Sequence, residues 1–380
     1  MNNNQIIIFG DICPDNDYRQ LFDDNKNAAF SDEIANDISK AALVIGNLEC
    51  PATNNKKPIV KCGPSLRAEI SDVMKLKDIG FHVLSLANNH ILDYGEKGVE
   101  DTLRVCADNG MKFVGAGENC MDATVPLVCE MDNKKVGIVS LAEAEFNLAR
   151  PSAPGANHFD PYLSFETIEE LKKECDYVIV LYHGGIEYYK YPSPLLQKKC
   201  RWMARAGADL VLCQHSHCIG TMEQYNGATI VYGQGNSTFG YRDGNDSWNE
   251  GLLVEVDLAK EEKVQFKLLK AASNGVEYAT KEESDSRIEQ MKKDSEKLKD
   301  AEWISEQWSM FVDTQKALDM PLLYGWNRVF NKLNRMTNNR LIDILYSKKK
   351  KMITMNLLRC EAHHEVVQTI LENEVFGNRE

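Results

Sequence analysis

The chain has 380 residues, of which 43% are hydrophobic and 27% charged. It is long enough for one large α/β domain with an appendage, or for two domains. The formal net charge of −13 argues against nucleic acid as the main partner, because neutralising phosphates requires a basic surface. No apolar stretch reaches the ~18–20 residues of a membrane span. The brief apolar N-terminal run and the eleven cysteines without a CxxC pair favour a cytoplasmic protein with reduced thiols.

Apolar strands alternate with amphipathic helices along the first two thirds of the chain. Strands are predicted at 6–10, 42–46, 81–86, 112–114, 127–130, 135–140, 177–182, 210–213, 229–232, 252–258 and 264–269. Helices are predicted at 31–41, 67–79, 95–109, 167–174 and 194–206, and a loop at 150–161. A turn at Asp132-Asn133 would join the hairpin 127–140. Repeated strand–helix–strand units favour a layered α/β sandwich with right-handed crossovers.

The composition changes from about Tyr278 onward, where strand patterns end and long charged helical segments begin. We therefore predict a first domain at 1–278 and an α-helical C-terminal region at 279–380. Tryptophans in this region, such as Trp303, are best explained as packing anchors. The Lys348–Lys351 run could touch anionic lipid headgroups or polymer, although such runs usually form a solvated face.

Five of the apolar runs lead to polar residues that are able to bind a divalent metal. Short Val/Ile/Leu-rich runs are typical of buried parallel strands, and ligands gather beyond the carboxyl ends of such strands. The residues at these ends are Asp11, then Asn47 and Glu49, then Asn88, Asn89 and His90, then His183, and finally His215 and His217. Carboxylate, amide and imidazole groups delivered to one edge predict a metal-assisted active site.

The His215-x-His217 spacing adds to this prediction, because residues two apart in an extended chain share a face. We expect one or two divalent ions, Mn, Zn or Fe, since two metals about 3.5–4 Å apart can clamp a phosphate. Candidate substrate-binding residues are Asn47, Asn88, Glu187 and Asn236. One of the two asparagines at 88–89 could merely supply a turn conformation, and Glu187 could simply be exposed.

The motifs FGD, GNLE, ANNHILDYG, HGGIEY, QHSHCIG and GQGN occur in this order between residue 5 and about residue 270. As a set they resemble the CapA-like poly-γ-glutamate and capsule synthesis proteins, a family with a calcineurin-like metallophosphoesterase fold. The resemblance implies that Asp11 and His217 bind a first metal, and that Asn89, His183 and His215 bind a second. It further implies that Glu49 bridges them, and that His90, oriented by Asp93, is the general acid or transition-state stabiliser.

Two positions depart from the pattern of ordinary metallophosphoesterases. Cys13 stands where the first motif has a histidine, so the first metal site is expected to be weak or differently filled. Glu49 replaces the usual bridging Asp and reaches one methylene further. Both departures bear on whether the site hydrolyses phosphoesters efficiently.

The resemblance implies a metal-dependent hydrolase or transferase in capsule or exopolymer synthesis, acting on phosphoester or activated acyl groups. Its expected partners are an anionic polymer or phosphorylated substrate and other capsule synthesis proteins. The alternative is a non-catalytic, metal-binding assembly subunit of a polymer synthase. A nucleotide-binding module is disfavoured, because no phosphate-cradling glycine loop opens a helix.

Overall fold

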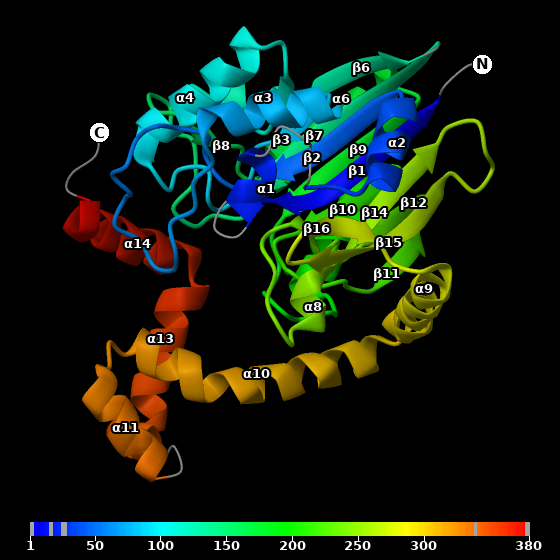
Figure 1. The fold of residues 1–380 in the computed structure, drawn as a ribbon. Helices are drawn as coiled ribbons and strands as arrows, with labels where there is room; N and C mark the ends of the chain where they lie inside the picture. The colour runs from blue at the N-terminus through cyan, green and yellow to red at the C-terminus, as the bar shows by residue number, and fades with distance from the viewer. Residues whose placement is uncertain (1–3, 15–17, 24–28, 132, 338–339, 377–380) are drawn as a thin grey trace. The chain divides into compact units, whose positions relative to one another are not determined.

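The computed structural model describes residues 4–14, 18–23, 29–131, 133–337 and 340–376. Contacts divide the chain into two compact units, Met1–Ile304 and Ser305–Glu380. The first unit contains two large sheets with helices on their outer faces (Figure 1). The second unit consists of helices.

The first sheet has eight strands and combines a parallel half with an antiparallel half. In sheet order its strands are β16 (Gly275–Tyr278), β15 (Val264–Ala272), β14 (Glu250–Asp257), β1 (Gln5–Ile12), β2 (Leu43–Leu48), β3 (Val83–Ser85) and β4 (Lys112–Val114), and β13 (Asn236–Thr238) also pairs with β1. The pairs from β1 through β4 are parallel, whereas β14, β15 and β16 add antiparallel strands beside β1. The carboxyl ends of β1, β2 and β3 therefore meet at one edge.

The second sheet has six strands and a parallel centre. Its order is β11 (Met222–Tyr225), β12 (Ala228–Val231), β10 (Leu210–Gln214), β9 (Tyr177–His183), β7 (Lys134–Ala142) and β6 (Leu127–Met131). Strands β7, β9, β10 and β12 run parallel, and the outer strands β6 and β11 are antiparallel to their neighbours. A small separate ladder joins β5 (Ala116–Gly117) to β8 (Gly155–Ala156).

Apolar side chains alternate between two layers of the core, because successive residues of a strand point to opposite faces. In β1, Ile6 and Ile8 face the core between the two sheets, whereas Ile7 and Phe9 face the helices. All four side chains are fully buried. This continuous apolar run is what a strand covered on both faces requires.

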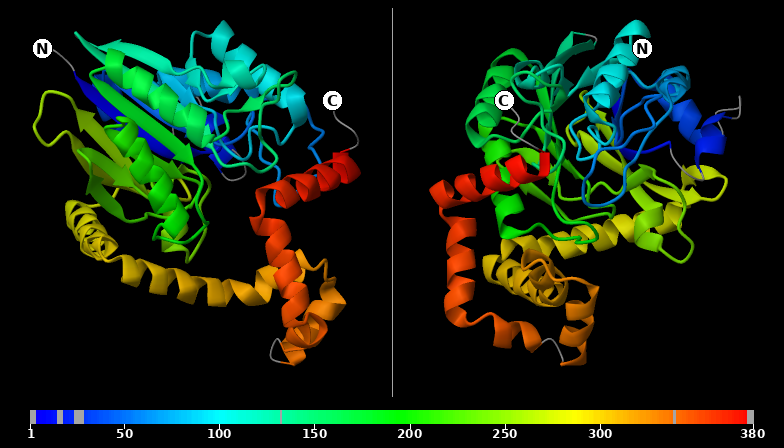
Figure 2. Two further views of the ribbon diagram at one scale, coloured as in Figure 1. Left: turned by 180° about the vertical axis from the view of Figure 1, so that it is seen from behind. Right: turned by 90° about the vertical axis from the view of Figure 1, so that its left-hand side faces the viewer.

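Helices cover the outer face of each sheet (Figure 2). The cores that they share with the sheets include α2 (Asp32–Lys40), α3 (Ile70–Ile79) and α4 (Gly95–Asp108) on the first sheet, and α6 (Pro161–Glu174) and α7 (Pro194–Ala206) on the second. Shorter helices are α1 (Arg19–Asp23), α5 (Cys120–Ala123) and α8 (Asp246–Asn249). Ser31 caps α2 by accepting a hydrogen bond from the Ile34 amide.

The predicted layered α/β sandwich with a helical C-terminal region is confirmed. Helix α6 begins at Pro161, within the predicted loop, because Asp160 caps it and proline is favoured in a first helical turn. The short strands β5, β8, β11, β13 and β16 were not predicted from the sequence. Of the expected turn at Asp132-Asn133, Asp132 lies outside the described residues.

Helix α9 (Lys281–Ser295) packs on the sandwich, where Met291 joins the core between the sheets and Ser295 accepts a hydrogen bond from the Met222 amide. The contacts thus keep α9 and the 3-10 helix at 296–299 in the first unit. Helix α10 (Ala301–Leu323) crosses the division after Ile304. It is followed by α11 (Arg328–Met336), α12 (Leu341–Leu345), α13 (Lys348–Arg359) and α14 (Glu361–Phe376). Across the described ranges, no helix has the length and apolar character needed to span a membrane.

Candidate metal centre

The strand order brings polar residues from both halves of the first unit together. Asp11, near the end of β1, pairs in register with Asn47 of β2 and with Asn236 of β13. Glu49 directly follows β2, and His183 is the last residue of β9. All of these side chains are buried. The edge at which they meet is formed by strand carboxyl ends, where parallel sheets place their ligands.

Two groups of metal-ligating side chains share one carboxylate. Glu49, His183 and His215 form one group, and Asp11, Glu49 and His217 form the other. Within each group the potential ligand atoms lie within 4.8 Å of one another. The shared Glu49 has the position that a carboxylate bridging two cations would take.

Glu49 is fully buried, and neither of its carboxylate oxygens has a hydrogen-bond partner of good geometry among the described residues, although Oε1 lies 3.5 Å from His183 Nε2. His215 Nδ1 is likewise buried and unpaired there. A buried carboxylate without partners is costly unless it is paired or coordinates a metal. The carboxylate oxygens of Glu49, which lie among the imidazoles of both groups, therefore fit a divalent cation.

Burial dominates the electrostatics of the cluster. Burial, and then repulsion by Glu49, raises the pKa of Asp11 to about 8. Burial also raises the pKa of Glu49 well above its usual range. Burial lowers the pKa of His183 and of His215 to about 4 each, and the pKa of His217 to about 3. A bound cation favours ionised carboxylates and neutral imidazoles, and so offsets the desolvation that raises the carboxyl pKa values.

Three asparagines of the cluster make short polar contacts with its carboxylate and imidazole groups, and one of them, Asn89, is itself a candidate ligand. Asn47 Nδ2 donates to Asp11 Oδ1 at 2.7 Å, and Asn89 Oδ1 lies 2.9 Å from His183 Nε2. Asn236 Oδ1 lies 2.9 Å from His217 Nδ1. An amide oxygen only accepts, so His217 carries its proton on Nδ1 and its Nε2 is free to bind a metal.

The segment around the two neighbouring histidines differs from the extended chain that the spacing suggested. Strand β10 ends at Gln214, and His215 and His217 have φ angles of +89° and +49°. Positive φ is unfavourable for residues with a side chain and is typical of functional sites. The His215 amide donates to Asp11 Oδ2 at 3.1 Å, which helps to hold this conformation. The extended geometry was wrong, yet both rings still reach Glu49.

His90 and Asp93 form a tight pair beside the cluster. His90 Nδ1 lies 2.6 Å from Asp93 Oδ2, and His90 Nε2 lies 4.0 Å from Glu49 Oε1. Lys61 forms a buried ion pair with Asp93 and places its Nζ 3.1 Å from His90 Nδ1. Lys61 was not predicted from the sequence, because it lies in a polar loop rather than at a strand end.

The remaining predicted residues differ in their position. Asn88 donates to the Leu48 carbonyl at 2.8 Å and accepts from the His90 amide, so it shapes the turn. Glu187 is exposed, but close enough for its charge to raise the pKa of Glu49. Glu145, after the end of β7, was missed, although its Oε1 lies 3.9 Å from His215 Nε2. Its position shortly after the end of an apolar strand could have identified it in the sequence.

An aromatic wall flanks His217, whose ring centroid lies 4.8 Å from that of Phe239 and 4.9 Å from that of Trp248. Arg242 stacks on Trp248 and donates to the Tyr188 hydroxyl at 3.2 Å. Tyr188 is half exposed. This wall offers apolar surface and one cation beside the candidate metal centre.

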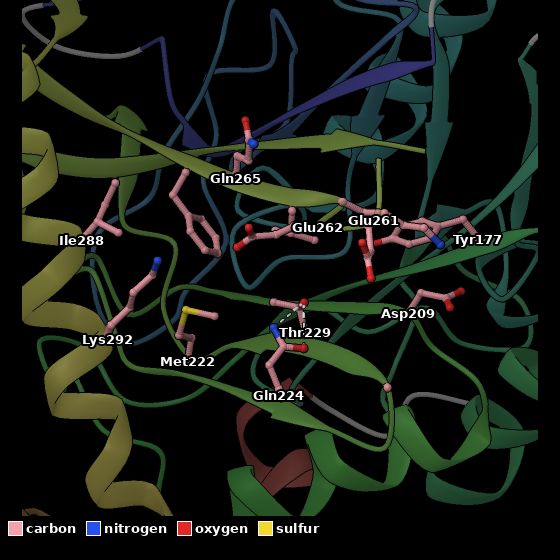
Figure 3. A pocket seen from close by; sticks show the side chains of 14 residues that line it. Tyr177, Asp209, Met222, Gln224, Thr229, Glu261, Glu262, Gln265, Ile288 and Lys292 are labelled. Carbon is pink, nitrogen blue, oxygen red and sulfur yellow. Dashed lines mark hydrogen bonds between the residues drawn. The ribbon is translucent and has the colours of Figure 1, made fainter. Parts of the chain in front are cut away.

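Figure 3 shows a cavity of about 670 Å³ whose lining contains no residue of the cluster. Its lining includes Tyr177, the first residue of β9, and Asp209, which precedes β10. Glu261 and Glu262, from the turn between β14 and β15, also line it. The cavity is therefore at the amino-terminal ends of β9 and β10, opposite to the ends that carry the histidines.

Comparison with known families matches residues 5–241 to the model described as "Bacterial capsule synthesis protein PGA_cap". This chain belongs to that family. The matched range covers every residue of the two metal-ligating groups, and the resemblance drawn from the motifs is confirmed.

Two curated relatives come from bacilli. The chain is 34% identical over 229 residues to "PGA biosynthesis protein CapA" of Bacillus subtilis (strain 168), which covers 57% of this chain and 58% of that protein. It is 32% identical over 211 residues to "Capsule biosynthesis protein CapA" of Bacillus anthracis, covering 53% and 51%. The chain thus spans little more than half the length of these relatives.

Solved structures are similar only distantly. A hypothetical protein from Thermus thermophilus has a TM-score of 0.45 and 13% identity, covering 70% of this chain and all of that one. A 5'-nucleotidase from Candida albicans has a TM-score of 0.42 and 10% identity, covering 84% of this chain and 59% of that one.

Proposed function

We propose that this protein is a metal-dependent hydrolase or transferase that acts on phosphoester or activated acyl groups in capsule or exopolymer synthesis. Membership of the capsule synthesis family supports the biological role. The observation that carries the chemical part is the buried Glu49, which lies in both metal-ligating groups and has no hydrogen-bond partner of good geometry among the described residues.

The proposed ligands divide between two cations that share Glu49. Asp11 and His217 complete one site, and His183, His215 and Asn89 complete the other. Mn, Zn or Fe suits this mixture of carboxylate, amide and imidazole. Cations bound there would supply Lewis-acid charge at the reacting group.

His90 is the proposed proton carrier of the reaction. The 2.6 Å contact between His90 Nδ1 and Asp93 Oδ2 requires a proton between the two atoms, so Nε2 faces the cluster. Asp93 fixes the orientation of the ring, and Nε2 would hold or release a proton at the leaving oxygen. The substrate is proposed to be a phosphorylated or anionic polymer precursor, and Glu187 and Arg242 are the proposed contacts of its distal part.

The metal content of purified variants tests the proposed centre. Glu49→Ala and His215→Ala should each lose tightly bound Mn or Zn, measured by elemental analysis after dialysis, because each removes a ligand from a buried site. His158→Ala is the matched control, since His158 is exposed and belongs to neither group. Unchanged metal content in Glu49→Ala would refute the proposed centre.

A second candidate, a non-catalytic assembly subunit of a polymer synthase, is supported by Cys13. This thiol is buried in the apolar core under the helices and belongs to neither metal-ligating group. The site of Asp11 and His217 therefore lacks the further imidazole that ordinary metallophosphoesterases place there. Phosphomonoesters, phosphodiesters and γ-glutamyl peptides, each assayed with Mn, Zn and Fe, would distinguish the two. Metal binding without turnover in any combination would favour assembly.

A further inference from the structure

The second unit contains a strongly basic stretch within an acidic chain. Residues 328–359, here called the basic segment, comprise α11, α12 and α13 and the residues between them. They include nine lysines and arginines and a single acidic residue, Asp343, whereas the whole chain has a net charge of −13. Such separation of charge along a chain is typical of a segment that meets an anionic surface.

The basic segment also exposes an apolar face on α11. Val329, Phe330, Leu333 and Met336 follow one another at helical spacing, and their exposed fractions lie between 44% and 73%. Arg328, Lys332 and Arg335 repeat at the same spacing on the adjacent side of the helix. A helix with an apolar face beside a basic face is typical of binding in the plane of a membrane surface.

Packing within the second unit covers only part of the apolar face of α11. The basic segment folds on itself through Ile342, which is buried, and through Asn334, which accepts a hydrogen bond from the Ile342 amide. The rings of Tyr324 and Tyr346 also stack, with centroids 3.6 Å apart. The side chains of Val329 and Met336 remain mostly exposed.

Helix α13 also combines basic and exposed apolar residues, but here they follow one another along the chain. Its first turn is Lys348–Lys351, and none of its residues is buried. Met352, Ile353 and Leu358 follow the lysines, and each is more than half exposed. Long lysine side chains can reach headgroup phosphates while neighbouring apolar groups enter the acyl boundary.

We propose that the basic segment binds an anionic lipid surface, with the apolar face of α11 and the apolar residues of α13 entering the interface. A second copy of the chain fits this face less well, because pairing would bring two highly basic segments together. A nucleic acid would use the cations but leave the apolar side chains uncovered. An anionic bilayer surface satisfies both features.

Co-sedimentation of the full chain with phosphatidylcholine vesicles, with and without phosphatidylglycerol, tests the proposal. We expect binding only when phosphatidylglycerol is present, and weaker binding at high salt. Val329→Asp/Met336→Asp should abolish binding, with Met121→Asp/Val125→Asp in the first unit as the matched control, since those side chains are also highly exposed. Lys348→Gln/Lys349→Gln should weaken it by roughly an order of magnitude, whereas Lys281→Gln/Lys299→Gln should not.

Three outcomes would overturn the proposal. The first is equal binding, or no binding, to the two kinds of vesicle. The second is vesicle binding that is unchanged in both Val329→Asp/Met336→Asp and Lys348→Gln/Lys349→Gln. The third is a stable dimer, seen by light scattering, that Val329→Asp/Met336→Asp converts to a monomer, since a second copy would then cover the face. None of these outcomes depends on metal binding or turnover.

Discussion

The two units of the chain differ in how far they bury their large apolar side chains. In the first unit, residues such as Ile8 are fully buried between layers, and the buried charges are paired or gathered around Glu49. In the second unit, Ile344 and many other large apolar side chains of the described residues are exposed. The sandwich is thus stabilised by its own packing, whereas the helical unit leaves much of its apolar surface exposed.

The largest difference between the two units is expected in the free-energy cost of breaking an ion pair. Lys61 and Asp93 have side chains that are only 3% and 1% exposed, so Lys61→Met would leave a buried carboxylate without its cation. Breaking a buried pair from one side typically costs roughly 3–5 kcal/mol. Lys351 and Asp343 form the corresponding pair of the second unit at 35% and 46% exposure, where loss of an ion pair costs about 1 kcal/mol or less.

Urea unfolding of Lys61→Met and Lys351→Met measures this difference in the free energy of unfolding. Lys61→Arg should recover part of the loss because it restores the charge. Equal, small effects in Lys61→Met and Lys351→Met would mean that the Lys61 pair is hydrated in solution, and the contrast between the units would not extend to charges.

Isoleucine substitutions make the same comparison for packing. Ile8→Ala should lower the free energy of unfolding by roughly 2–5 kcal/mol, since it removes a fully buried side chain from the core between the sheets and leaves a cavity. Ile344→Ala should change it by about 0.5 kcal/mol or less, because that side chain is 74% exposed. A cost above ~2 kcal/mol for Ile344→Ala would show that the second unit buries this face in the free protein.

The sequence predicted that most polar residues of the candidate metal centre meet at one edge, because the rule about strand ends is a property of parallel sheets. Asp11, Glu49 and His183 each follow a continuous apolar run. Parallel pairing of β1 with β2 brings Asp11 and Glu49 to one edge, whereas His183 ends β9 in the other sheet and joins them through the packing of the two sheets. Glu145 was missed because its strand was interpreted as part of a hairpin. Lys61 was missed because only the tertiary structure carries its loop to Asp93.

Other differences have local causes. His215 and His217 have positive φ angles, and contacts such as the hydrogen bond from the His215 amide to Asp11 Oδ2 help to hold this backbone conformation. No local sequence pattern reveals such a contact. Strand β11 has the sequence MEQY and little apolar content, so its place at the sheet edge depends on pairing with β12. The exposed apolar face of α11 was also unforeseen, since helical periodicity alone does not tell whether a face is covered.

Loss of a helix N-cap should have the smallest effect, and this effect should be the same in both units. Ser193 caps α7 by accepting a hydrogen bond from the Leu196 amide, and Asn327 caps α11 by accepting from the amides of Val329 and Phe330. Replacing either cap by alanine should cost about 1 kcal/mol, since a cap satisfies exposed amides within one helical turn and depends little on the layers beyond it. Urea unfolding reports Ser193→Ala, and hydrogen exchange of the first-turn amides of α11 reports Asn327→Ala as a similar loss of protection. If only Ser193→Ala lowered stability, the ends of the sandwich helices would depend on tertiary packing. The two units would then differ in local stability as well as in burial.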